Sequence, residues 1–198
     1  MYNRDYLSNQ STQHTQESSQ VQLMSFLKAT YQLFAGSLLA ATAGAYIGLG
    51  IVSLLMGPVK WVLFAIELAL IFFVIPRVKH TPGVNLAVLF AFTFISGLTI
   101  APLLTSILNM PGGAAIVGQA FLMTSVAFGG ISMFAMTTKR DFSSMGKFLI
   151  IALIIMIVAG ISNIFIQSSM MQLAIASAGA LLFSAFILYD TQQIIKGN

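Results

Sequence analysis

The 198-residue sequence contains no cysteine and very few charged residues. The absence of cysteine excludes disulfides and thiolate chemistry, and it leaves the redox compartment undefined. Charged residues make up 7% of the chain, whereas a soluble domain carries roughly 25%, so a water-facing surface cannot be covered. Only two histidines occur, His14 and His80, and no metal-ligand cluster, nucleophile-and-base set or phosphate loop is recognisable. We therefore expect a protein that is not an enzyme and holds no cofactor.

Hydrophobic residues make up 58% of the chain, and they form six long runs separated by Gly, Pro or charged residues. Apolar runs near 20 residues are typical of membrane-spanning helices. They are continuously apolar rather than alternating, which disfavours a β-barrel. The sequence predicts an all-α polytopic membrane protein with six transmembrane helices. The expected spans are residues 29–56, 61–76, 84–108, 114–137, 148–166 and 173–195.

The first 22 residues are polar and rich in Gln and Ser, which predicts a disordered tail ahead of a helical bundle over 23–198. Eight of the nine basic residues then fall on the side of the membrane that holds this tail, and only Lys60 falls on the other. The positive-inside rule places that side in the cytosol. We expect a multi-pass protein of the bacterial inner membrane with a cytosolic N-terminus. The basic residues lie in short segments between apolar runs, where topology signals occur, so nucleic acid is not an expected partner.

Small residues recur at every fourth position of the first span, at Gly36, Ala40, Gly44 and Gly48. This spacing puts them on one helix face and permits close approach of a neighbouring helix. We interpret the stripe as a packing surface.

Three ionisable residues lie within or at the edge of the spans: Glu67, Arg77 and Asp190. Such groups usually face a bundle interior or a water path. At about 1.5 Å per residue, Arg77 and Asp190 both lie roughly 25 Å from the outer side, and Glu67 lies roughly 10 Å from it. The shared depth predicts an Arg77–Asp190 pair that could act as a latch. Two plainer readings stay open, an ordinary interfacial carboxylate at Asp190 and a structural hydrogen bond at Glu67.

Several stretches resemble the transmembrane Bax inhibitor motif family, and together they cover nearly all of the chain after the tail. They are "FAIELALIFF" (64–73), "FAFTFISGLTIAPLL" (90–104), "TKRDFSSMGKFL" (138–149), "ISNIFIQS" (161–168) and "LLFSAFILYDTQQIIKG" (181–197). The last stretch is the most specific, because an aspartate is followed there by a polar pair and a short amphipathic exit.

The resemblance implies a seven-helix bundle around a central sixth helix, whereas this sequence ends at Asn198, before a seventh helix. Bacterial family members are described as pH-sensitive calcium leak channels with an aspartate sensor on the sixth and seventh helices. The first sensor aspartate corresponds to Asp190, the acid of the second helix to Glu67, and a nearby arginine to Arg77. The resemblance thus implies a cation leak in which Asp190 senses pH with Arg77. Glu67 and Asp190 would line the ion path, and Asp190 would transiently contact calcium.

Two other functions stay open. A different bacterial branch of the family resembles a modulator of a membrane-bound AAA protease, and the N-terminal tail here could serve as its handle. A transporter of a small solute is the third reading, although no convincing internal repeat is visible. Beyond the lipid bilayer, the sequence defines neither an oligomeric state nor an ion selectivity.

Overall fold

The computed structural model describes residues 3–196 of the chain, with side chains from residue 21 onward. Every regular element in these described residues is helical, and six helices are long and apolar enough to cross a membrane. The prediction of an all-α polytopic membrane protein is confirmed. The chain divides into two compact units, Met1–Gln119 and Ala120–Asn198, with the division inside one helix, α6. Each unit is therefore described by itself.

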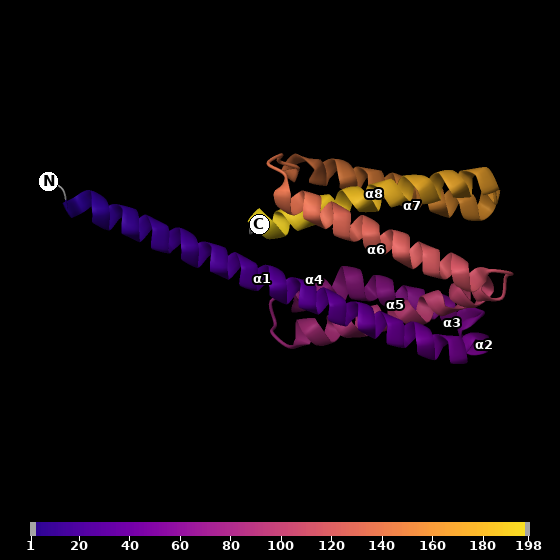
Figure 1. The fold of residues 1–198 in the computed structure, drawn as a ribbon. Helices are drawn as coiled ribbons and strands as arrows, with labels where there is room; N and C mark the ends of the chain where they lie inside the picture. The colour runs from indigo at the N-terminus through magenta and orange to yellow at the C-terminus, as the bar shows by residue number, and fades with distance from the viewer. Residues whose placement is uncertain (1–2, 197–198) are drawn as a thin grey trace. The chain divides into compact units, whose positions relative to one another are not determined.

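Unit 1 is built on two long parallel helices that lie side by side, α1 and α5 (Figure 1). Its elements are α1 (Asn3–Gly50), α2 (Val52–Leu55), α3 (Pro58–Ala69), the π-helical segment η1 (Leu70–Val74), α4 (Ile75–Val78), α5 (Val84–Leu108) and the start of α6 (Gly113–Thr137). Most large apolar side chains point outward and are exposed, as expected of helices that face lipid.

The backbones of α1 and α5 approach each other closely at glycines. A Cβ atom added to Gly44 would lie 2.0 Å from the carbonyl oxygen of Phe94, and one added to Gly97 would lie 2.0 Å from that of Ala41. Gly48 likewise faces the Ala101 side chain. The prediction that the small-residue stripe of the first span is a packing surface is confirmed, and its partner is α5.

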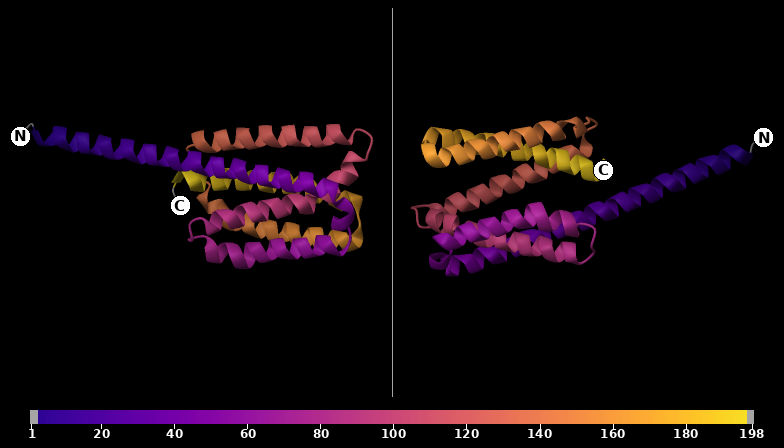
Figure 2. Two further views of the ribbon diagram at one scale, coloured as in Figure 1. Left: turned by 90° about the horizontal axis from the view of Figure 1, so that it is seen from below. Right: turned by 180° about the vertical axis from the view of Figure 1, so that it is seen from behind.

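The first helix differs from the expected span at both ends. The backbone of residues 3–22 is helical and continues α1, where the sequence predicts a disordered tail; residues 1–2 lie outside the described residues. This first part of α1 extends beyond the other helices of unit 1 (Figure 2). Extending an existing helix needs no new nucleation, so a polar segment can follow the apolar one. At the other end α1 stops at Gly50, and the chain bends at Ile51 before the short α2.

The second membrane-length segment, Pro58–Val78, is not a regular α-helix along its whole length. It starts with Pro58 at the first helical position, where the missing N–H is not needed. It then widens into the π-helical turn η1 and ends in α4, which contains Pro76. Proline has no backbone N–H to donate to a carbonyl oxygen of the preceding turn, so it weakens the regular helix there. Turns of π-helix often occur at functional sites.

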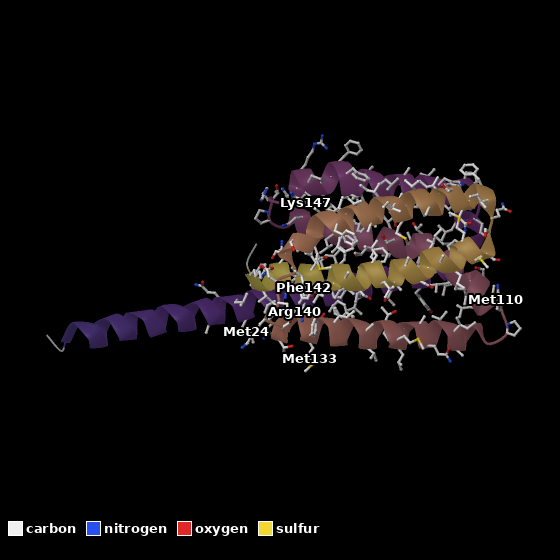
Figure 3. The ribbon with its side chains drawn as sticks, turned by 90° about the horizontal axis from the view of Figure 1, so that it is seen from above. Met24, Met110, Met133, Arg140, Phe142 and Lys147 are labelled. Atoms are coloured by element: carbon white, nitrogen blue, oxygen red, sulfur yellow. The ribbon has the colours of Figure 1, made fainter. Side chains whose placement is uncertain are left out.

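Unit 2 contains the end of α6, the 3-10 turn η2 (Ser143–Met145), α7 (Gly146–Ile166) and α8 (Ser169–Lys196). α7 and α8 pack against each other, and a tight turn with Gln167 in the left-handed conformation (φ 53°) joins them. Arg140, Phe142 and Lys147 lie at one end of this unit (Figure 3), the end at which α8 finishes. The fold therefore brings the α6–α7 loop onto the last turns of α8.

Candidate functional site

Glu67 lies on α3, one turn before the π-helical segment. The side chain is half-buried, and its Oε1 atom is buried with no hydrogen-bond partner among the described residues. An unpaired polar atom in an apolar environment carries a substantial free-energy cost. A water molecule, an ion or a side chain of another element is therefore the expected partner of this oxygen.

Arg77 lies on α4 and is exposed. Its Nη1 atom donates a hydrogen bond of 2.6 Å to the backbone carbonyl oxygen of Phe73 in the π-helical segment. The guanidinium thus satisfies a carbonyl of the irregular turn, and its other donors stay available for a carboxylate.

Asp190 lies on α8, two turns before the end of the helix. Its side chain is exposed within unit 2 and has no hydrogen bond or ion pair with any described residue. Asp190 and Arg77 belong to different units, so their pairing stays a prediction. Neither Glu67 nor Asp190 is part of a preformed metal site, because the described residues contain no group of three His, Asp or Glu side chains that could hold a metal ion.

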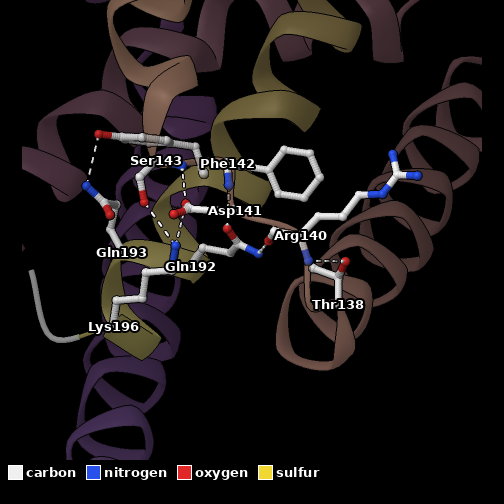
Figure 4. A network of polar contacts seen from close by, with 9 residues as sticks. Thr138, Arg140, Asp141, Phe142, Ser143, Gln192, Gln193 and Lys196 are labelled. Atoms are coloured by element: carbon white, nitrogen blue, oxygen red, sulfur yellow. Dashed lines mark hydrogen bonds and ion pairs between the residues drawn. The ribbon is translucent and has the colours of Figure 1, made fainter.

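A second polar cluster joins the α6–α7 loop to α8 (Figure 4). The Gln192 side chain is 4% exposed and bonds the loop backbone twice. Its Oε1 atom accepts a hydrogen bond of 3.0 Å from the Phe142 N–H, and its Nε2 atom donates one of 2.8 Å to the Arg140 carbonyl oxygen. We call this arrangement, completed by Asp141, Ser143 and Lys196, the clasp.

Lys196, at the end of α8, completes the clasp. Its ammonium group forms an ion pair with Asp141 and donates a hydrogen bond of 3.0 Å to the Ser143 hydroxyl. The Asp141 carboxylate also accepts a bond of 2.8 Å from the Ser143 N–H. The hydrogen bond from Lys196, together with that N–H, holds the pKa of Asp141 well below its usual range. Asp141 is therefore charged throughout the physiological pH range.

Next to the clasp, the start of α7 packs closely against the last turns of α8. Gly146, the first residue of α7, is buried against Tyr189 of α8, and an added Cβ atom would lie 2.6 Å from the tyrosine hydroxyl oxygen. That hydroxyl accepts a hydrogen bond of 3.0 Å from Gln193 Nε2, whereas Gln193 Oε1 is buried without a partner among the described residues. The close contact between Gly146 and Tyr189 thus fixes the start of α7 against the end of α8, whereas the Gln193 bond lies within α8.

The sequence interpretation missed the clasp. The ionic partner of Asp141 is Lys196, 55 positions away in the sequence, and its second partner is the neighbouring N–H of Ser143. The available signal was the pair Gln192–Gln193 inside the last apolar run, since a buried amide needs hydrogen-bond partners. Their partners could not be read from the sequence.

Six membrane-length helices and carboxylates placed within them define the class of this protein, a multi-pass helical membrane protein. The chain belongs to the family described as inhibitor of apoptosis-promoting Bax1, whose model matches residues 23–198. The resemblance stated from the sequence is confirmed.

Relatives in bacteria and in an animal share much of the chain. It is 49% identical to an uncharacterised protein of Campylobacter jejuni over all of this chain and 85% of that protein. It is 38% identical to a membrane protein of Vibrio cholerae, over 87% of this chain and 76% of the relative. It is 34% identical to mouse protein lifeguard 4, over 87% of this chain and 72% of the relative.

Proposed function

We propose that this protein is a cation leak channel, with calcium as the favoured permeant ion, and that protonation of Asp190 opens it. The observation that carries the proposal is the buried carboxylate oxygen of Glu67, which has no hydrogen-bond partner among the described residues and lies beside a π-helical turn in a membrane-length segment. Membership in the Bax inhibitor family supports the same function, because the resemblance of this sequence to bacterial family members implies a pH-sensitive calcium leak. The chain would lie in the bacterial inner membrane with its N-terminus in the cytosol.

In the closed state, the Asp190 carboxylate would hold the Arg77 guanidinium and so fix α8 against α4. Opposite charges attract strongly where water is scarce. Protonation would remove the charge of Asp190 and release the arginine. Glu67 would then offer a carboxylate oxygen to a passing ion. Calcium takes six to eight oxygen ligands in a stable site, so one or two carboxylates provide transient contacts rather than a storage site.

The test is calcium flux into liposomes that contain the purified protein, measured from pH 5 to pH 8. Asp190→Asn mimics the protonated acid, so we expect high flux with little pH dependence. Asp141→Asn is the matched control, because that carboxylate lies outside the spans and is engaged by Lys196; its flux should follow the wild-type pH profile. If Asp190→Asn keeps both the flux and the pH profile of the wild type, Asp190 has no part in gating.

Two further variants separate the roles of the other residues. Arg77→Gln removes the partner of the ionised aspartate and should raise the flux at pH 8. Glu67→Gln should lower the flux at every pH and leave the pH profile unchanged. A shift of the pH profile in Glu67→Gln would instead make Glu67 part of the sensor.

A regulator of a membrane-bound AAA protease is the second candidate function. The projecting first part of α1 favours it, because an unfolding machine needs an accessible segment to engage (Figure 2). Deletion of residues 1–22 should abolish association with such a protease and leave calcium flux unchanged. Association that survives the deletion would exclude the tail as the handle.

A further inference from the structure

A pocket of about 330 Å³ lies next to the clasp, between the end of α6, the loop that follows it and the end of α8. Its lining combines the basic residues Lys139, Arg140 and Lys196 with the apolar side chains of Met136 and Ile195. Its size falls at the lower end of the range of small-molecule sites, which is about 300–1,000 Å³. A basic and partly apolar lining suits an amphipathic anion.

Two of the three cations at the pocket are free to bind such an anion. Lys196 is engaged by Asp141, the one carboxylate in the lining, and these two charges offset each other. The side chains of Lys139 and Arg140 are exposed and have no hydrogen-bond or ion-pair partner among the described residues. In Figure 4 the Arg140 guanidinium points away from the clasp, while its carbonyl oxygen binds Gln192. The loop backbone is therefore fixed by Gln192, and the charged side chain of Arg140 is left available to bind an anion.

The position of the pocket indicates where the anion comes from. α6 ends at Thr137 and α8 ends at Lys196, and both helices are long enough to cross a membrane. The pocket at their ends therefore lies at the depth of the lipid headgroups. Basic pockets between transmembrane helices at this depth are suited to anionic headgroups.

We propose that this pocket binds the headgroup of an anionic phospholipid, with Lys139 and Arg140 contacting the phosphodiester. Met136 and Ile195 would contact the glycerol and the first carbons of the acyl chains. Arginine offers a planar fork of donors that matches two phosphate oxygens, and lysine adds a point charge. The clasp gives the site its rigidity, since Gln192 fixes the loop that carries both cations.

The experiment is native mass spectrometry of the full chain in detergent, titrated with equal amounts of phosphatidylglycerol and phosphatidylcholine. The wild type should retain phosphatidylglycerol in preference. Lys139→Gln and Arg140→Gln should each weaken this binding about fivefold, and the double variant about 25-fold. Lys147→Gln is the matched control, because Lys147 is an exposed lysine at the same end of unit 2 that does not line the pocket. Its binding should equal that of the wild type.

Each outcome decides between specific alternatives. Equal weakening in Lys147→Gln and the pocket variants would show a diffuse surface attraction and overturn the proposal, as would unchanged binding in the double variant. The charge-preserving exchange Lys139→Arg with Arg140→Lys should keep most of the preference, which separates loss of charge from loss of folding. Inorganic phosphate is added in a third arm. If it displaces phosphatidylglycerol at comparable concentrations, the pocket recognises a free anion and the assignment to lipid is wrong.

Discussion

Replacement of Gln192 by leucine tests the clasp directly, because the two side chains have similar size and only the polar contacts are lost. Gln192 is 4% exposed and satisfies the Phe142 N–H and the Arg140 carbonyl oxygen. A buried group that loses its partner costs about 1–3 kcal/mol. Phe142 is half-buried and Arg140 is exposed, so water can satisfy the carbonyl but reaches the N–H poorly. We therefore expect the loop to be destabilised by about 2 kcal/mol, mainly through that N–H.

The assay is limited digestion by trypsin, which cleaves after Lys139 and Arg140 inside this loop. When the loop opens and closes faster than the protease cuts, the cleavage rate is proportional to the equilibrium population of the open loop. A change of about 2 kcal/mol should then accelerate cleavage about thirtyfold. Mass spectrometry of the fragments separates this cut from those at other basic residues.

Gln193→Leu is the matched control, since Gln193 neighbours Gln192 and, among the described residues, its side chain bonds only Tyr189 of the same helix. Its loop cleavage should stay within a few-fold of the wild-type rate. If Gln192→Leu is cleaved no faster than Gln193→Leu, the clasp does not hold the loop, and the rigidity proposed for the phospholipid pocket beside it loses its basis.

The sequence predicts the helices of this protein well, because their physical signal is local. The third expected span, residues 84–108, has the same bounds as α5, since Gly83 stops the run on one side and the Asn-Met-Pro-Gly-Gly turn on the other. The small-residue stripe likewise predicts the tight face of α1. Both features depend on residues close together in the chain, so periodicity and turn chemistry suffice.

Features that depend on distant residues could not be predicted. The partners of Gln192 and Lys196 lie 50 or more positions earlier in the chain. No local pattern distinguishes a buried glutamine that binds a loop from one that faces a neighbouring helix. The π-helical segment could not be predicted either, because a shift in backbone hydrogen bonding leaves hydropathy unchanged. The nearby Pro76, in α4, is the sequence feature that accompanies it. The pairing of Arg77 with Asp190 depends on the arrangement of two units and stays a prediction.

Two further predictions concern stability. Gly44→Val should lower the unfolding temperature in detergent by several degrees, as overpacking costs about 1–3 kcal/mol and the added Cβ atom would meet the Phe94 carbonyl. Gly129→Ala is its control, since a Cβ atom there meets no described residue within 4 Å; a similar loss in both would refute the tight α1–α5 contact. The second prediction concerns pH. Folding lowers the pKa of Asp141 from its unfolded value of about 3.9, so its ion pair with Lys196 stabilises the fold above about pH 4 and loses this effect as pH falls further. The difference in loop cleavage between the wild type and Asp141→Asn should therefore be constant from pH 5 to pH 8. It should shrink only under strongly acidic conditions, measured with an acid-active protease such as pepsin. A difference in cleavage rate that changes between pH 6 and pH 7.5 would mean that another titrating group contacts the clasp. The ion pair between Asp141 and Lys196 could then no longer be treated as independent of the pH sensor proposed at Asp190.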